Sequence, residues 1–351
     1  MGDFSRRKFL RGAATSAAVA AATPACSFSV VTRRLRSPVA VASANGIKAV
    51  ELAVQRMTEG WRPVDAAVAG VELVENDAED DSVGLGGLPN EDGVVELDAC
   101  VMDGPSGLGG AVAALQNVKN PAQVALKVMR HTDHVLLVGD GALRFARAHG
   151  FQEENLLTEK SRQKWLEWRE KRSAIDDWLS PEENGEHGKE WFRRFKDKTG
   201  TIHLGAVDAN GDVGSCTTTS GMAFKLAGRV GDSALIGCGN YCDNDIGTGG
   251  ATGRGEACIL ANGGSFVVHQ MALGKSPTDA CLEAVKRVVR LTKVKRLLDD
   301  KGRPDFQVQF YATNKAGEIG AAAIHAGPYA LCDAKGPRLA DLASLFQEPP
   351  R

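Results

Sequence analysis

One segment rich in glycine and hydroxyl residues, Gly200 to Glu256, constrains the fold of this 351-residue chain most strongly. Thr201 to Val207 is an apolar run with the composition of a strand, and it directly follows a glycine. Residues 208–212, DANGD, carry the Asn-Gly signature of a tight hairpin turn. Val213 to Thr219 then provides the returning strand. The segment predicts an antiparallel hairpin whose first strand begins at a hydroxyl residue.

Patterns of strands and helices on both sides of this hairpin favour an α+β fold with two sheets between helical layers. Helices are expected from Ile47 to Met57, from Pro63 to Val74, from Pro121 to Met129, over 139–149, from near Gly255 and, capped by Ser276, over 277–289. Further strands are expected at Val39–Ser43, at Val94–Met102, at Val135–Val138 (buried), at Ala234–Gly237 and in a last hairpin over 306–325.

Thr201 is the candidate nucleophile. If the peptide bond after Gly200 is cut, Thr201 carries a hydroxyl and a free α-amine on the same residue. An α-amine titrates near pH ~7.7–8.0, so it can act as a general base at neutral pH with little tuning. Thr219 ends the returning strand of the hairpin and is therefore expected beside Thr201. The alternative for both residues is an ordinary structural role in a strand.

Arg229 and Asp232 lie three residues apart in a loop flanked by glycines. A guanidinium offers a planar fork for a carboxylate, and a carboxylate offers acceptors for an ammonium group. The pair therefore suits the free α-carboxylate and α-amine of an aspartyl compound. The alternative is a surface ion pair of little energetic weight.

The segment resembles the start of the β-chain in the glycosylasparaginase (aspartylglucosaminidase) family of N-terminal-nucleophile hydrolases. The stretches SPVAVASANGIKAVELA, SVGLGGLPNEDGVVELDACVMDG, VKNPAQVALKVM and HVLLVGDGALRFARAHGF resemble the family's α-chain in the same order. The resemblance covers roughly residues 37–327. It implies a four-layer αββα sandwich and self-cleavage between Gly200 and Thr201, with no metal or other cofactor.

The resemblance also implies roles for individual residues. Thr201 is the nucleophile, the Thr219 hydroxyl lies beside it, and Arg229 and Asp232 bind the aspartyl group. Thr252 and Gly253 would hold the oxyanion, because such a site needs a hydroxyl and a backbone N–H aimed at the developing charge. Gly255 would line the same pocket.

Two positions depart from the family pattern. Many glycosylasparaginases have Asp before the nucleophile, whereas this chain has Gly200, as in the related plant-type asparaginase and isoaspartyl peptidase branch. The family's tryptophan on the pocket wall corresponds to Ala44. The second departure puts the preference for glycosylated asparagine in question.

The first 30 residues are expected to form a twin-arginine-type export signal, with Ser5-Arg6-Arg7-Lys8-Phe9-Leu10 followed by a short alanine-rich run. That run is too short to span a membrane. The protein is therefore expected in the periplasm or outside the cell. A basic tail is the alternative, and lipid attachment at Cys26 is not expected because Thr23 occupies the place of the usual leucine.

The mature chain is expected to form one domain, residues 37–345, with an α-chain to 200 and a β-chain from 201. A charged segment at about 153–200 holds four of the five tryptophans and is expected to be a linker ending at the nucleophile. The alternative is a solvated surface helix anchored by a tryptophan, and both can hold in different parts of the segment. Its last residues are expected to be mobile, and Trp165 and Trp168 to share one helix face.

Several classes of function are excluded or disfavoured. A net charge of −2 gives no electrostatic case for binding nucleic acid. GLGGLPNEDG at 84–93 lacks the strand and helix of a dinucleotide site, and the segment from His269 to Ser276 lacks the leading glycine of a phosphate loop. His131-x-x-His134 has no third metal ligand nearby. The cysteines from Cys100 onward are expected to be buried thiols, with one disulfide as the alternative.

The sequence thus predicts an exported N4-(β-N-acetylglucosaminyl)-L-asparaginase that acts on a small-molecule substrate as a homo-oligomer of cleaved protomers. The alternative enzyme is an isoaspartyl peptidase or L-asparaginase. A non-catalytic protein that captures aspartyl ligands through Arg229 and Asp232 is a third hypothesis, which the set of Thr201, Thr219 and Thr252 disfavours.

Overall fold

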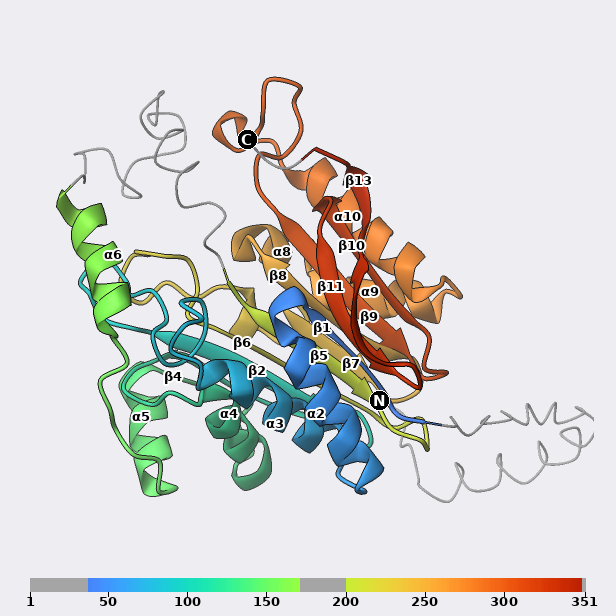
Figure 1. The fold of residues 1–351 in the computed structure, drawn as a ribbon, viewed down its shortest axis with the longest axis horizontal. Helices are drawn as coiled ribbons and strands as arrows, with labels where there is room; N and C mark the ends of the chain where they lie inside the picture. The colour runs from blue at the N-terminus through green and yellow to red at the C-terminus, as the bar shows by residue number, and fades with distance from the viewer. Residues whose placement is uncertain (1–36, 171–199, 349–351) are drawn as a thin grey trace, which may run out of the picture. The chain divides into compact units, whose positions relative to one another are not determined.

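Two β-sheets with helices packed on their outer faces make up the computed structural model, which describes residues 37–170 and 200–348 (Figure 1). All the elements below belong to one compact unit, residues 34–351. The predicted export signal, the last residues of the linker, Trp178 and Trp191 lie outside the described residues.

The larger sheet, sheet A, has eight strands. Their spatial order is β12 (Gly336–Asp341), β11 (Pro328–Asp333), β1 (Val39–Ser43), β5 (Ile202–Val207), β6 (Val213–Thr219), β2 (Leu97–Asp103), β3 (Leu108–Leu115) and β4 (Leu136–Val138). The predicted hairpin is confirmed as β5 and β6, with Ile202 opposite Thr218. Gly211 in its turn has φ +84°, and the Asp208 carboxylate accepts hydrogen bonds from the backbone N–H groups of Asn210 and Asp212.

The smaller sheet, sheet B, has five strands. Their order is β13 (Ala343–Phe346), β10 (Ile319–His325), β9 (Val308–Asn314), β8 (Gly247–Gly253) and β7 (Asn240–Asp243). The predicted hairpin of β9 and β10 is confirmed, but it is not the last, because β11 and β12 form another. β7 and β8 had not been expected, because glycine-rich segments carry little strand propensity.

Helices cover the outer face of each sheet. On sheet A lie α2 (Ile47–Thr58), α3 (Pro63–Glu75) and α4 (Pro121–His131), and on sheet B lie α8 (Gly255–Ala261), α9 (Gly263–Ala272) and α10 (Pro277–Leu291). The Ser276 side chain caps α10 as predicted, accepting from the Asp279 backbone N–H. The outer helix α5 (Gly139–Ala148) packs on β3 and β4 at one edge of sheet A, whereas α6 (Glu159–Glu170) lies apart from α5 (Figure 1). Short 3-10 turns are η1 (Ala44–Gly46), η2 (Asp232–Ala234) and η3 (Lys295–Leu297).

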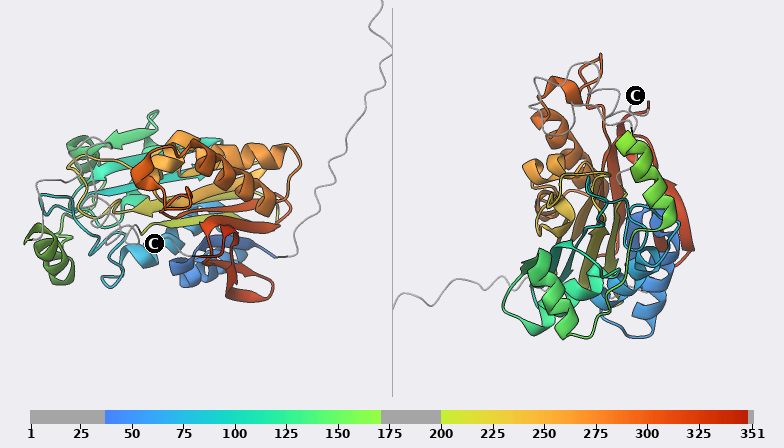
Figure 2. Two further views of the ribbon diagram at one scale, coloured as in Figure 1. Left: turned by 90° about the horizontal axis from the view of Figure 1, so that it is seen from above. Right: turned by 90° about the vertical axis from the view of Figure 1, so that its left-hand side faces the viewer.

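The inner faces of the two sheets pack on each other. Val41 of β1 and Tyr311 of β9 belong to one small apolar cluster, and Val207 of β5 and Cys242 of β7 belong to another. Figure 2 shows the strands between the two groups of helices. The α+β class is therefore confirmed, and the inner sheet interface is where β5 meets β8.

Three predicted strands need correction. The run Val135–Val138 is not buried, since Leu136 is 38 % and Val138 55 % exposed, because β4 is the edge strand of sheet A. Ala234–Gly237 forms no ladder strand: η2 and a single bridge at Ile236 replace it, and Gly237 turns the chain at φ +94°. β2 begins at Leu97 rather than Val94, because the Asn90 side chain accepts from the Val94 N–H and closes a turn there.

The two tryptophans of α6 lie on one helix face as predicted. Trp168 is buried and stacks on Phe224 with ring centroids 4.9 Å apart, and Trp165 Nε1 donates to the Glu91 carbonyl at 3.0 Å. The seven cysteines from Cys100 to Cys332 are free, and all but the half-buried Cys238 are buried. Over the described ranges, no helix has the length and apolar character needed to cross a bilayer.

Candidate active site

Thr201 lies at the start of β5 and is buried, with 9 % of its surface exposed. Its Oγ1 donates to Thr219 Oγ1 at 3.0 Å, and Thr219 Oγ1 donates to the carbonyl oxygen of Gly200 at 2.7 Å. The Gly221 N–H donates to Thr219 Oγ1 at 2.9 Å. The hydroxyl hydrogen of Thr219 is thus donated to the carbonyl of Gly200, the residue before the predicted cleavage site. The structure brings the predicted nucleophile, Thr219 and that carbonyl together, as the hairpin register suggested.

Thr252 lies near the end of β8, opposite the start of β5. A Cβ on Gly205 would lie 2.3 Å from Thr248 Oγ1, and a Cβ on Gly250 would lie 2.0 Å from the ring of His203. Residue 205 thus faces 248 and residue 203 faces 250, so the two strands run in opposite directions and the facing pairs are two residues apart. Side chains on one face of a strand repeat every two residues. The next step of this pattern puts Thr201 opposite Thr252.

Thr252 and its neighbour Gly253 have the features expected of an oxyanion site. Thr252 is buried, and its Oγ1 lies 2.8 Å from the hydroxyl of Tyr311. Gly253 has φ +107°, and a Cβ there would lie 2.3 Å from the Gln307 carbonyl. Only glycine fits this backbone without strain.

Arg229 and Asp232 lie together beside Gly255. A Cβ on Gly255 would lie 2.9 Å from Asp232 Oδ1 and 3.0 Å from Arg229 Nη2. A Cβ on Gly221 would lie 3.3 Å from Arg229 Nη1. Because Gly221 is also bonded to Thr219, these contacts connect the charged pair to the nucleophile.

The carboxyl group of Asp232 is buried and lacks a full set of hydrogen-bond partners. Asp232 is 5 % exposed, and burial raises the pKa of its carboxyl to about 7, although the Arg229 charge opposes the rise. Asp232 Oδ2 is buried and has no hydrogen-bond partner among the described residues. Burying an acceptor without a hydrogen-bond donor costs free energy. An ammonium group brought to this oxygen would satisfy it.

Several residues of the site were not predicted from the sequence. Glu256 accepts two hydrogen bonds from Arg229, and Tyr311 contacts Thr252. Lys225 is buried, and its Nζ donates to the carbonyls of Ser220 and Glu96. Burial lowers the pKa of Lys225. Only Glu256 had a local signal, since an acidic residue directly follows Gly255.

Ser82, in the glycine-rich loop, was also missed. A Cβ on Gly200 would lie 1.6 Å from Ser82 Cβ, so the two residues are in direct contact. The Ser82 carbonyl accepts from the backbone N–H and the hydroxyl of Ser220 at 2.8 and 2.9 Å. The loop is thereby fixed to the residue that follows Thr219.

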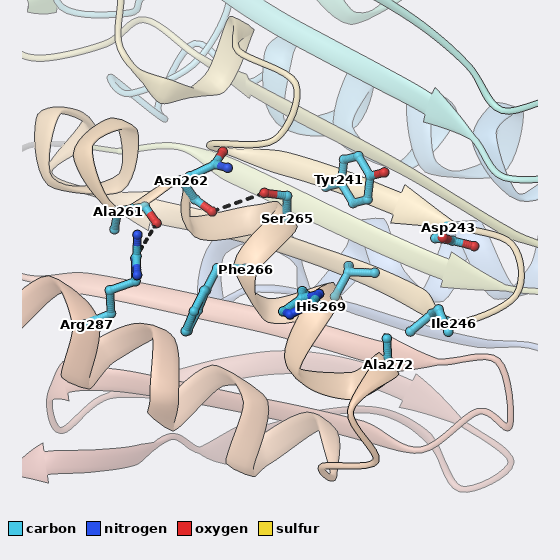
Figure 3. Close-up of a pocket in the computed structure, with 11 residues that line it drawn as sticks. Tyr241, Asp243, Ile246, Ala261, Asn262, Ser265, Phe266, His269, Ala272 and Arg287 are labelled. Atoms are coloured by element: carbon cyan, nitrogen blue, oxygen red, sulfur yellow. Dashed lines mark hydrogen bonds between the residues drawn. The ribbon is translucent and has the colours of Figure 1, made fainter.

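A separate surface pocket of about 510 Å³ lies over α9 and β7 (Figure 3). Arg287 and Asp243 line it at opposite ends, and Arg287 Nε donates to the Ala261 carbonyl at 2.9 Å. None of the predicted site residues lines it. The part of the chain that the structure describes also contains no cluster of three His, Cys, Asp or Glu side chains that could hold a metal ion. The candidate site at Thr201 is thus separate from this pocket.

Comparison with known proteins bears on the family of the chain and not on single residues. A family model described as asparaginase matches residues 30–297. The N(4)-(beta-N-acetylglucosaminyl)-L-asparaginase of Elizabethkingia miricola is 44 % identical over 284 residues, covering 81 % of this chain and 77 % of that protein. A putative N(4)-(beta-N-acetylglucosaminyl)-L-asparaginase of Drosophila melanogaster is 33 % identical over 280 residues, covering 74 % and 68 %.

The chain is also similar to a relative named for a different activity. The isoaspartyl peptidase/L-asparaginase of Xenopus laevis is 37 % identical over 218 residues, covering 61 % of this chain and 65 % of that protein. The resemblance drawn from the sequence is confirmed by these matches, and the chain belongs to the asparaginase family of amidohydrolases.

Proposed function

We propose that this chain is a self-cleaving amidohydrolase that hydrolyses the side-chain amide of asparagine derivatives, with N4-(β-N-acetylglucosaminyl)-L-asparagine as its substrate. One observation carries the proposal: Thr201 Oγ1, Thr219 Oγ1 and the Gly200 carbonyl form one line of hydrogen bonds. The nucleophile and the bond it must first cut therefore lie together in the uncut chain. The name and 44 % identity of the bacterial relative support the substrate.

The first step is cleavage between Gly200 and Thr201. Thr201 Oγ attacks the Gly200 carbonyl carbon, a C–O bond forms and the C–N bond breaks. The hydroxyl proton is transferred to the released nitrogen, which becomes the α-amine, and water then hydrolyses the ester. Thr219 donates to the carbonyl oxygen on which negative charge develops.

The freed Thr201 then acts on the substrate. Its α-amine takes the proton from Oγ as Oγ attacks the side-chain amide carbon, and passes it to the leaving amine. Thr252 and the Gly253 N–H hold the oxyanion. A β-aspartyl ester of Thr201 forms, and water hydrolyses it to aspartate.

Substrate recognition falls to Arg229 and Asp232, with Gly255 leaving the space between them. Arg229 binds the α-carboxylate and Asp232 the α-ammonium group. Glu256 supports Arg229 from the other side through Nε and Nη2. A substrate with both groups free is therefore required.

A second function, isoaspartyl peptidase or L-asparaginase activity, is favoured by one residue. Ala44, at the start of η1, replaces the aromatic wall expected from the resemblance. Less stacking area weakens selection for a sugar over a smaller leaving group. Rates on glycosylasparagine, a β-aspartyl dipeptide and free asparagine decide between the two functions. A strong preference for the sugar would mean that another residue supplies the wall.

Three further properties belong to the same proposal. The two sheets and their outer helices support a four-layer αββα sandwich. Arg6 and Arg7 support export by a twin-arginine route, so replacing both with Lys would leave precursor in the cytoplasm. A homo-oligomer of cleaved protomers, expected from the sequence, belongs to the same proposal.

Self-cleavage tests the central claim. The wild-type protein is expected to run as two fragments, with Thr201 at the N-terminus of the smaller one. Thr201→Ala is expected to stay uncut and inactive, whereas Thr201→Ser keeps a hydroxyl and still cuts. Intact mass and N-terminal sequencing measure both. Turnover of substrate by uncut chain would overturn the mechanism, and an uncut wild type that binds aspartate would favour a binding protein.

A further inference from the structure

Cleavage after Gly200 needs a group that accepts the proton of Thr201 Oγ as the new C–O bond forms. Position 200 has no side chain. Thr219 accepts the Thr201 hydrogen in the uncut chain, but its own hydrogen is donated to the Gly200 carbonyl, so it has no base to which it can pass a proton. The α-amine of Thr201 does not yet exist at this stage. The acceptor must therefore come from elsewhere in the fold.

Ser82 occupies the space where a side chain of residue 200 would begin. A Cβ on Gly200 would lie 1.6 Å from Ser82 Cβ and 2.0 Å from Ser82 Oγ. No rotamer change removes a clash with a Cβ atom, so position 200 accepts only glycine while the loop stays in place. The Ser82 hydroxyl is consequently packed against the residue whose carbonyl is attacked.

Asp80 holds that hydroxyl. Both the backbone N–H, at 3.0 Å, and the hydroxyl of Ser82 donate to Asp80 Oδ1. Asp80 Oδ2 accepts from Asn45 Nδ2 at 3.1 Å. Asn45 Oδ1 in turn lies 2.7 Å from Ser43 Oγ, which lies 3.2 Å from the Thr201 carbonyl. These bonds enclose the scissile peptide, from the Gly200 side to the far side of Thr201.

We propose that Asp80, acting through Ser82, supplies for cleavage at Gly200–Thr201 the carboxylate that position 200 lacks. Asp80 is a positioning residue in this scheme. In this proposal the Thr201 hydroxyl turns from Thr219, to which it donates in the structure, toward Ser82. Ser82 Oγ then accepts the Thr201 proton and passes its own to Asp80, and the reverse transfer delivers a proton to the released nitrogen. One proton moves from oxygen to nitrogen, so no other reactant is required. The inference rests on the proposed self-cleavage.

The test is the rate of cleavage in freshly synthesised full-length chain, followed by intact mass. Asp80→Asn is expected to slow cleavage about 100-fold, within the range of a lost acid–base group. The matched control is Asp81→Asn. Its carboxylate is next in sequence, in the same loop, and is paired with Lys164 instead of Ser82. Asp81→Asn is expected to cut within about twofold of wild type.

A purely structural role for Asp80 is distinguished by chemical rescue. Asp80→Ala leaves a cavity beside Ser82 in which a small carboxylate can bind. Formate is expected to accelerate cleavage of this variant at least about tenfold over chloride at equal ionic strength. Both salts are compared on one sample, so a folding defect alone cannot produce the difference.

The outcomes separate the two proposals. If the wild type does not cut, self-cleavage itself is refuted. If the wild type cuts but Asp80→Asn keeps its rate, or formate is no better than chloride, only the role of Asp80 is overturned.

Discussion

Arg229 makes two hydrogen bonds to one oxygen of Glu256, 2.9 and 2.7 Å long. Its third nitrogen, Nη1, faces Gly221 and Gly231, whose missing side chains leave room there. A guanidinium fixed on one edge by a carboxylate presents its other edge in a defined orientation. Glu256 thus orients the cation before the substrate binds.

Replacing Arg229 with Ala is expected to lower kcat/KM about 100-fold, because charge-assisted hydrogen bonds to the α-carboxylate are lost. Arg338→Ala is the matched control, because it removes a similar two-bond pair between Arg338 on β12 and Asp333 at the end of β11. Steady-state kinetics on free and α-amidated substrates measure the effect. Equal wild-type rates on both substrates would remove Arg229 from the site.

Asp232 gives the site a pH dependence of its own. Burial raises its pKa to about 7 in the unliganded protein. Below that pH the carboxyl is protonated and attracts an ammonium group less, so kcat/KM is expected to fall as the pH drops through about 7. Asp232→Asn should lose this limb while keeping the one due to the Thr201 amine. A substrate without the α-amine is the control. If kcat/KM for that substrate falls equally as the pH drops through about 7, the assignment to Asp232 is refuted.

The contact between β5 and β8 depends on missing side chains. Gly250 lies against the ring of His203, whose Nδ1 is 2.8 Å from Thr217 Oγ1. Burial lowers the pKa of His203 to about 3, so the ring is neutral at ordinary pH. A neutral ring in contact with a glycine lets the two sheets approach closely enough to place Thr252 opposite Thr201.

Gly250→Ala is expected to destabilise the fold by about 1–3 kcal/mol through overpacking, and to lower activity by moving β8 away from β5. Gly141→Ala is the control, because a Cβ there meets no atom within 4 Å and lies in the helix α5. That change should stabilise by about 0.5–1 kcal/mol. Thermal unfolding and kcat measure both. A Gly250→Ala protein with unchanged stability and rate would contradict the close packing.

Glu75 connects three elements behind the site. It ends α3, accepts from Thr218 Oγ1 of β6 at 2.7 Å and accepts from the Ala122 N–H at the start of α4 at 3.1 Å. Burial raises its pKa from 4.5 to about 7. A raised folded-state pKa gives stability that is full below the unfolded value and is lost as the pH rises through the folded value.

The free energy of unfolding is therefore expected to fall between pH 5 and pH 8, by an amount on the order of 3 kcal/mol from about 1.4 kcal/mol per pH unit. Glu75→Gln should remove this contribution and leave the one from Asp232, whose pKa burial also raises to about 7. Urea unfolding at the two pH values, in the uncut Thr201→Ala background so that one chain is followed, provides the measurement. An equal pH dependence in both proteins would assign the effect to other groups.

Sheet A interleaves the two fragments that cleavage would produce. β1, from before residue 200, lies between β11 and β5, and β2 pairs with β6. Neither fragment can leave without breaking ladders on a central strand. We therefore expect cleavage to change the covalent structure and to leave the fold intact.

Gel filtration of the cleaved protein is expected to give one peak containing both fragments, and denaturant is expected to separate them. The isolated fragment from Thr201 onward should fail to fold, because it lacks the strand between β5 and β11. A folded, soluble C-terminal fragment by circular dichroism would contradict this reading of the topology.

The sequence by itself determined the elements whose signals are local. The Asn-Gly turn gave the β5–β6 hairpin and its register, so Thr219 was expected beside Thr201, and the structure has them hydrogen-bonded. The cap at Ser276 and the apolar spacing of α2 and α3 are equally local. Each depends on residues a few positions apart, which propensity and periodicity can detect.

Only the tertiary structure decided which distant residues meet. Nothing near Gly200 in the sequence indicates Ser82, and nothing near His203 indicates Gly250. The exposure of β4 was mispredicted for the same reason, since an apolar run reads alike in a central and an edge strand. Periodicity specifies which face of a strand is apolar, whereas the partner of that face depends on how the two sheets stack.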